Sequence, residues 1–318
     1  MIKTWRKYER NAKMKLLIEK ASTRLLNKTI KIPSKINYEL LPCDDAQEKI
    51  KNIITAGQPA LIARFGSVEA RCTAEGIGIM LGARKTFDEY TLRTINRNAG
   101  VFPYGEEMAL RFSEISKESA KEVDILGFWD TYMQDYLLNE VCKKDIILTH
   151  LGNLEPYRNS NPWSAALEGK KVLVIHPFKD SIESQYKKRT ELFENPDVLP
   201  SFDLKVIKAV QTIAGSKDER FKDWEQALDY MYNEAMSCDF DVAIIGCGAY
   251  GMPLGAKLKQ SGKIAIHLGG ATQILFGIKG KRWESRELYM KLFNEHWVKP
   301  LETEKPASAS LVENACYW

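Results

Sequence analysis

Residues 241–270 constrain the fold more than any other part of the chain. An apolar, β-branched run over 242–245 leads into a glycine-rich turn, a helix-compatible stretch over 253–261, and a second apolar run over 264–268. Pro253 suits the first turn of a helix, where its missing N–H has little consequence. The pattern therefore predicts a strand, a tight turn, a helix and a second strand parallel to the first.

The turn itself has the spacing of a phosphate-binding loop. Gly246, Gly248 and Gly251 match the G-x-G-x-x-G pattern that cradles a pyrophosphate. The helix that follows offers unpaired N–H groups to an anion. A dinucleotide site also requires an Asp or Glu at the end of the second strand, and residues 267–270 (His-Leu-Gly-Gly) supply neither. We therefore expect a phosphate or nucleotide here rather than NAD, with a purely structural turn as the alternative.

Composition places the chain among globular proteins. Hydrophobic residues make up 44% of the 318 residues and charged residues 28%. The apolar runs are too short to cross a bilayer, and no signal-peptide core is apparent, so we expect a cytoplasmic protein. The six cysteines are scattered without a Cys-x-x-Cys pair, which favours free thiols over a zinc site or a disulfide framework.

The positive charge is concentrated at the N-terminus. Residues 1–31 contain ten Lys or Arg and two Glu, a net charge of +8, and the rest of the chain has a net charge of −4. Residues 2–28 read as a basic amphipathic helix that suits an anionic membrane surface. The alternative is a helix packed on the domain or on a second subunit of a homo-oligomer. No folded module with stacking aromatics follows, so we expect no nucleic-acid partner.

The rest of the chain alternates between strand-like and helix-like segments. This alternation predicts an α/β fold: a Rossmann-like, mostly parallel sheet with helices on both faces. We expect two parts, a basic N-terminal helix over 1–35 and a single α/β domain over 36–318. Besides the two strands above, we expect strands over 59–65, 123–128, 145–149, 171–176 and 204–208. We expect helices over 46–56, 70–81, 106–120, 131–142, 182–193, 218–236 and 284–295.

Three of the four histidines end predicted strands. His150, His176 and His267 occupy equivalent places at carboxyl ends, which line the binding crevice of an open α/β sheet. After His176, Lys179 is a candidate phosphate ligand. Asp180 is a candidate base, with a helix cap as the alternative. A pair of these histidines holding a metal is a further alternative.

Another strand-to-helix turn carries Arg64 and Glu69 on either side of Gly66. Arg64 and Glu69 would either contact a ligand in the crevice or form an ion pair that fixes the loop. At the other end of the chain, Tyr317 and Trp318 are two aromatic residues. Exposed aromatic ends favour aggregation, so we expect this terminus to pack against the domain or a partner.

Residues 63–69, Ala-Arg-Phe-Gly-Ser-Val-Glu, carry a family resemblance. They resemble the Arg-Phe/Tyr-Gly-Asp-Gly-Glu signature of the GT-D-fold glycosyltransferases, bacterial enzymes of cell-surface polysaccharide and glycoprotein assembly. Residues 176–186 and the late glycine turn with residues 263–269 are also similar to that family, and the ending 297–318 resembles proteins of polysaccharide biosynthesis clusters. The resemblance covers about residues 45–295 and implies a GT-D-like fold.

In that family the signature supplies an Asp-x-Glu pair that binds a divalent cation beside the donor diphosphate. By resemblance, Glu69 matches the Glu, and Arg64 and Gly66 match their counterparts, but Ser67 stands where the Asp should be. One carboxylate with a hydroxyl is a weaker cage for Mn²⁺ or Mg²⁺. Either Ser67, Glu69 and the phosphates hold the metal, or a side chain such as Lys179 or Arg64 replaces it, or activity is lost.

These observations predict a glycosyltransferase that moves a sugar from a nucleotide-sugar donor to a glycan acceptor, which a polyprenyl lipid would carry at the membrane. The alternatives are an NAD(P)-linked oxidoreductase and a non-catalytic nucleotide- or sugar-binding scaffold. The candidate catalytic residues are Glu69, Asp180 and His176, and Glu69 is also the candidate metal ligand. The candidate donor-binding residues are Arg64, Gly66, Ser67, Lys179, Gly246, Gly248, Tyr250, Gly251, His267, Gly269 and Gly270.

Overall fold

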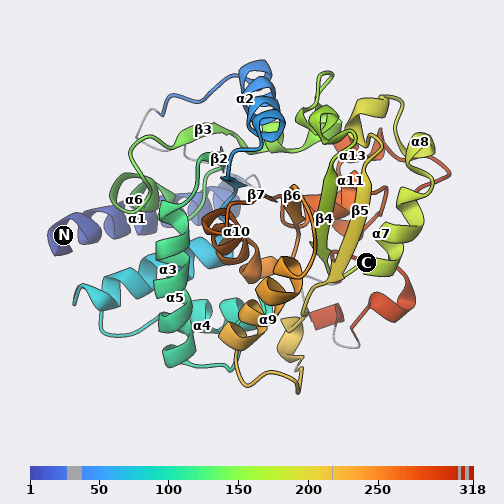
Figure 1. Cartoon of the computed structure of the whole chain (residues 1–318). Coiled ribbons are helices and arrows are strands. Elements are labelled where there is room, and N and C mark those ends of the chain that lie inside the picture. The colour runs from blue at the N-terminus through green and yellow to red at the C-terminus, as the bar shows by residue number, and fades with distance from the viewer. Residues whose placement is uncertain (27–37, 217, 307–308, 312–314) are drawn as a thin grey trace.

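The structure is a computed structural model that describes residues 1–26, 38–216, 218–306, 309–311 and 315–318. The described residues form one sheet of seven strands, all parallel, in the order β3-β2-β1-β7-β6-β4-β5 (Figure 1). The strands are β1 (Ala60–Ala63), β2 (Ile125–Phe128), β3 (Ile147–His150), β4 (Lys171–His176), β5 (Asp203–Lys208), β6 (Val242–Ile245) and β7 (Ile264–His267). All seven predicted strands are therefore confirmed. Short apolar runs between polar turns are a local signal that the sequence carries directly.

Helices cover both faces of this sheet, as the alternating pattern predicts. The described α-helices are α1 (Ile2–Leu26), α2 (Cys43–Ala56), α3 (Ser67–Met80), α4 (Glu89–Arg97), α5 (Glu106–Lys121), α6 (Gln134–Glu140), α7 (Lys179–Tyr186), α8 (Arg189–Leu192), α9 (Trp224–Met236), α10 (Gly251–Gln260), α11 (Ala271–Leu275), α12 (Lys281–Glu284) and α13 (Glu287–Met290). Side chains alternate between two cores. Leu61 and Ala63 pack with α3, α5, α9 and α10, whereas Ala60 and Ile62 face α2, α7 and the C-terminal segment.

The predicted helix over 284–295 is wrong. The structure has two short helices there, α12 and α13, separated by Ser285 and Arg286. Trp283 and Tyr289 would point roughly 120° apart on a continuous helix, yet both are buried in the second core. Because one continuous helix would not direct both rings into the same core, the helix is interrupted between them. For similar reasons of tertiary packing, the helix predicted over 182–193 is divided into α7 and α8, and α4 has no counterpart among the predicted helices.

The basic N-terminal helix α1 packs on the domain along one side. Trp5 is 1% exposed, and its indole N–H donates to the Ala74 carbonyl of α3 at 2.9 Å. Its ring occupies the place that a side chain at Gly78 would need. Glu9 pairs with Arg84 at 2.7 Å. Trp5 therefore faces the protein, in agreement with the alternative of a helix packed on the domain.

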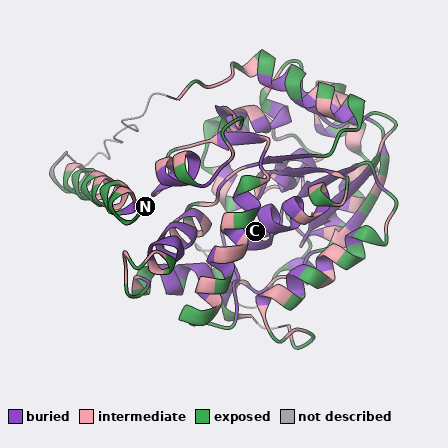
Figure 2. Ribbon diagram, turned by 60° about the vertical axis from the view of Figure 1, so that its left-hand side comes forward, coloured by how far each residue is buried: buried purple, intermediate pink, exposed green. Residues whose placement is uncertain are grey.

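The opposite side of α1 faces solvent, as its exposed and half-buried colouring shows (Figure 2). Met14, Leu17 and Ile18 are exposed there among lysines and arginines. In the described part of the chain no helix is both long and apolar enough to span a membrane.

Replacing Trp5 by Ala is expected to lower the free energy of unfolding by about 3 kcal/mol, because a buried indole and its hydrogen bond are lost. Urea denaturation of the whole chain measures this change. Leu17→Ala is the matched control, since Leu17 lies on the same helix but is 67% exposed, and its effect should stay within about 0.5 kcal/mol. Equal effects of the two variants would show that α1 is not docked through Trp5.

Candidate functional site

The strand order places a crevice at the carboxyl ends of β4 and β6. Strands β4 and β6 are neighbours in the sheet. After β4 the chain continues to β5 on one side of this pair, and after β6 it continues to β7 on the other side. The connections therefore diverge at this point, and an open α/β sheet binds ligands where they do so. The loops that begin at His176 and Gly246 form the two walls.

Two adjoining cavities open along this edge of the sheet. The wide cavity has a volume of about 540 Å³, within the range of roughly 300–1,000 Å³ typical of small-molecule sites. The narrow cavity, of about 110 Å³, lies over the crevice between β4 and β6. Arg64, Gly66, Glu69 and Tyr317 are among the residues that line both cavities.

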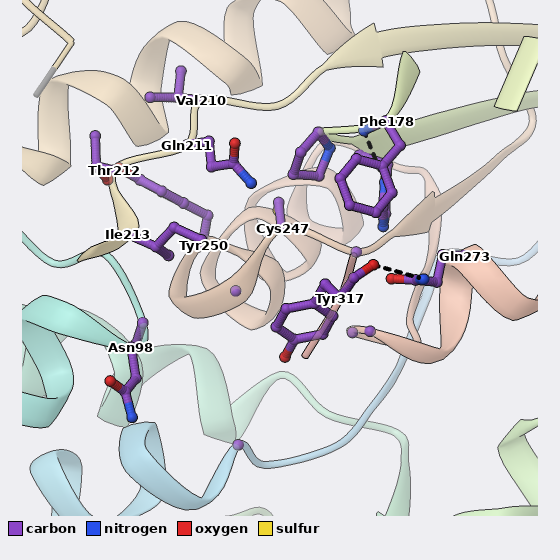
Figure 3. A pocket seen from close by; sticks show the side chains of 18 of the residues that line it. Asn98, Phe178, Val210, Gln211, Thr212, Ile213, Cys247, Tyr250, Gln273 and Tyr317 are labelled. Carbon is purple, nitrogen blue, oxygen red and sulfur yellow. Dashed lines mark hydrogen bonds between the residues drawn. The ribbon is translucent and has the colours of Figure 1, made fainter. Parts of the chain in front are cut away.

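His176 lies in the wall of the narrow cavity as a neutral hydrogen-bond donor. Its Nδ1 accepts a hydrogen bond from the Phe178 backbone N–H at 3.0 Å, drawn as a dashed line in Figure 3, so the ring proton is on Nε2. Burial lowers the pKa of His176 to about 3. A neutral imidazole with its lone pair already engaged cannot act as a general base, so His176 can only donate to a ligand.

His267 lies in the same cavity and is also neutral. Burial, and then the charge of Arg64, lower its pKa to about 3, and its Nδ1 lies 3.3 Å from the Ile245 carbonyl. A side chain at Gly251 would collide with this ring. A Cβ at Gly246 would lie 2.6 Å from the His176 ring. Two glycines of the G-x-G-x-x-G turn are therefore explained by packing against histidines.

The other residues of the glycine turns line the narrow cavity. Gly248 and Gly269 have φ of +58° and +61°, which favours glycine at both positions. A Cβ at Gly270 would lie 2.7 Å from the Tyr317 ring. Tyr250 stacks on Trp224 with ring centroids 5.0 Å apart. Gly248 and Gly270 also line the wide cavity, so these two glycines lie where a ligand could approach the backbone.

Arg64 follows β1 and lies between the two cavities. Its guanidinium carbon is 5.0 Å from the centre of the Trp129 ring. Its Nε is buried and has no hydrogen-bond partner among the described residues. Burial lowers the pKa of Arg64, and the negative charge of Glu69 acts in the opposite direction. A partly satisfied, desolvated guanidinium is suited to an anionic ligand.

Glu69 is the third residue of α3, and its carboxylate folds back over Gly66 at the start of this helix. A side chain at Gly66 would collide with the carboxylate. This is the position from which Glu caps a helix start. Ser67 is exposed and lines only the wide cavity. Among the residues that the structure describes, no three His, Cys, Asp or Glu side chains group to hold a metal. Ser67, two residues before Glu69, offers only a hydroxyl, so this turn supplies one carboxylate rather than a pair.

Several residues of the wide cavity carry no signal in the sequence. Arg282 donates from its Nη1 to the Tyr317 hydroxyl at 2.9 Å and stacks on that ring at 4.6 Å. Arg286 and Glu155 also line the cavity. Their segments are far from Arg64 in the sequence: Glu155 lies between β3 and β4, and Arg286 lies in the C-terminal segment. Only the tertiary fold brings them together. Aromatic residues complete the wall: Trp129, Trp283, Tyr289 and Tyr317.

Glu155 is the buried carboxylate of the wide cavity. It accepts a hydrogen bond from the Tyr289 hydroxyl at 2.9 Å, and Arg158 lies 3.6 Å away. Burial raises the pKa of Glu155 above its ordinary value. A carboxylate with a raised pKa is a stronger base than an exposed one.

Lys179 and Asp180 lie outside both cavities. They form the first turn of α7, where the Lys179 ammonium is 3.9 Å from Glu183. Asp180 is exposed, and its backbone N–H donates to Glu304 at 2.7 Å. His150 is exposed at the edge strand β3, where its Nδ1 accepts from the Gly152 N–H at 3.1 Å. The structure thus brings together two of the three strand-end histidines, without Lys179 or Asp180.

No protein-family model and no curated protein matches the sequence. Two solved structures of a domain of unknown function 1792 are similar to this chain. One is described as having a distinct glycosyltransferase fold; its TM-score is 0.45 at 14% identity, over 84% of this chain and 92% of that chain. The other, with selenomethionine, has a TM-score of 0.42 at 14% identity, over 73% of this chain and 78% of that chain.

The two buried histidines predict a pH dependence of stability. Their pKa values of about 3 lie below the ordinary value of about 6.5, so the unfolded chain binds more protons between these limits. Stability is therefore lost as pH falls below 6.5, by about 2 kcal/mol per histidine between pH 6.5 and 4.5. Urea denaturation of wild type and of the His176→Gln, His267→Gln double variant should show a much smaller loss in the variant. An equal loss in both proteins would refute the neutral, buried assignment.

Proposed function

We propose that the protein is a glycosyltransferase that binds a nucleotide-sugar donor in the wide cavity. The observation that carries this proposal is the set of three arginines in the cavity wall, Arg64, Arg282 and Arg286. Glycosyl transfer builds negative charge on the departing diphosphate, and guanidinium groups fixed nearby stabilise that charge. The planar fork of a guanidinium also matches two phosphate oxygens.

The aromatic side chains of the wide cavity suit the rest of such a donor. Trp129 and Trp283 present broad apolar rings, and Tyr289 and Tyr317 add hydroxyl groups. A flat nucleobase stacks on such rings without strong sequence preference. The cavity thus supplies cationic groups for a diphosphate and aromatic groups for a nucleoside.

In the reaction, the bond between the anomeric carbon and the diphosphate oxygen breaks, and a bond to the acceptor oxygen forms. The acceptor hydroxyl loses its proton. We assign that proton to Glu155, because it is buried in the wide cavity and burial raises its pKa. His176 is only a donor, Asp180 lies outside the cavities, and the Glu69 carboxylate folds over the start of α3.

We further propose that the outward side of α1 rests on an anionic membrane surface, where a lipid-linked glycan acceptor of cell-surface polysaccharide assembly would lie. Met14, Leu17 and Ile18 are exposed, and basic residues surround them. Apolar side chains entering the interface and lysines near anionic headgroups act together. The location that we propose is therefore cytoplasmic, on the inner face of the membrane.

Titration calorimetry with UDP, GDP, dTDP and NADH tests the donor proposal. We expect one nucleoside diphosphate to bind and Arg286→Ala to weaken it about tenfold or more, because a cation facing the diphosphate is lost. Lys291→Ala removes the same charge from the same segment, at a residue that lines neither cavity, and should leave affinity unchanged. Binding of NADH without any nucleoside diphosphate would instead support the oxidoreductase.

Glu155→Gln separates an enzyme from a binding scaffold. This variant should retain nucleotide affinity but lose sugar transfer by about a hundredfold or more, as expected when a general base is removed. Transfer is followed by release of the nucleoside diphosphate from the sugar donors of the nucleotide that binds. A wild-type protein that binds the donor but releases none with any glycan acceptor would be a scaffold.

Vesicle co-sedimentation tests the membrane proposal. The protein should sediment with phosphatidylglycerol vesicles but not with phosphatidylcholine vesicles, and added salt should weaken the association. Leu17→Glu should reduce it several-fold, because it places a charge in the exposed apolar patch. Leu288→Glu, at another exposed leucine on α13, is the control. Equal binding of both variants would refute the role of α1.

A further inference from the structure

We infer that this site holds the donor diphosphate with arginines alone, with no divalent cation. The inference rests on the proposed function and adds the means by which the leaving charge is neutralised. It departs from the Asp-x-Glu arrangement of the GT-D signature, in which two carboxylates hold a cation. The contacts of Arg64, Arg282 and Glu69 lead to it.

Arg64 lines both cavities. Its Nε is buried and makes no hydrogen bond within the described part of the chain, and burial lowers the pKa of the guanidinium. An anion in either cavity that accepts hydrogen bonds from this guanidinium would offset the cost of burying its charge. The Trp129 ring holds the guanidinium on one side, at 5.0 Å from its centre. The group is thus fixed in place before the ligand arrives.

Arg282 is fixed in advance by the C-terminus of the chain. Its backbone N–H donates to the Cys316 carbonyl at 2.9 Å, and its side chain bonds to and stacks on Tyr317. Trp318, the last residue, is buried. A guanidinium that is already ordered loses little conformational freedom when it binds an anion. Arg286 reaches the same cavity from the start of α13.

The carboxylates of the site are engaged with the protein. Glu69 folds over Gly66 and acts on the charge of Arg64, and Glu155 accepts from Tyr289. Ser67 contributes only a hydroxyl. Mg²⁺ and Mn²⁺ require several hard oxygen ligands, and neighbouring guanidinium groups repel them. Three arginines against two glutamates leave the cavity wall with an excess of positive charge.

The two arrangements predict opposite effects of Glu69→Gln. If Glu69 holds a cation, its replacement weakens diphosphate binding. If arginines hold the diphosphate, the variant removes a negative charge from beside Arg64, and binding stays equal or becomes tighter. Glutamine can also cap the start of α3, so the fold is retained. Whether Glu69→Gln weakens or strengthens diphosphate binding therefore distinguishes a cation held by Glu69 from arginines alone.

The experiment is calorimetric titration of UDP, GDP and dTDP into wild type, Glu69→Gln, Arg282→Ala and the Lys291→Ala control, each in EDTA and in Mn²⁺. We expect wild-type affinity to agree within about threefold between the two conditions, Glu69→Gln to bind at least as tightly, and Arg282→Ala to bind about tenfold more weakly. Binding in Mn²⁺ alone, a tenfold loss in Glu69→Gln, or an unchanged Arg282→Ala would overturn the inference and leave the proposed function intact. Absence of binding for all three nucleotides in both conditions would overturn the proposed function itself.

Discussion

A guanidinium at the carboxyl end of β1 determines how the surrounding site is built. Moving a charge out of water is unfavourable by several kcal/mol unless other groups compensate. Glu69, one helical turn further along the chain, supplies the opposite charge, and the Trp129 ring covers one side of Arg64. The two cavities keep the remaining sides accessible. This arrangement suits an anion at the carboxyl end of β1.

Neutral histidines complete the frame around that charge. His176 and His267 end two strands separated by β6, and the glycines of the turn after β6 make room for both rings. A charged imidazole would repel Arg64, whose field already lowers the pKa of His267. The two histidines thus give the narrow cavity uncharged side chains beside Arg64, which both cavities share, whereas Arg282 and Arg286 line the wide cavity. The two spaces differ in chemistry although they share a wall.

The sequence predicts the sheet well because its signals are local. β-Branched runs define the seven strands, and the motif of Arg64, Gly66 and Glu69 lies within six residues of one turn. Prediction from the sequence fails where a contact joins residues that are far apart along the chain. The glycine spacing at 246–251 looks like a phosphate loop, yet rings from two other strands fill the space beside Gly246 and Gly251. Lys179 and Asp180 follow a strand end, but Pro177 and Phe178 intervene before α7 begins, and the first turn of that helix lies outside the cavities.

The C-terminal segment decides the charge of the wide cavity. Arg282 lies in α12 and Arg286 directly precedes α13, and Trp283 and Tyr289 of these helices are buried in the second core. The end of the chain then fixes Arg282 through Cys316 and Tyr317. Strand β1 of the sheet positions Arg64, whereas the C-terminal segment positions Arg282 and Arg286. The proposed anion binding therefore depends on tertiary packing of the C-terminal segment as much as on the strand-end motif, so a motif that lacks its Asp is compatible with the proposed activity.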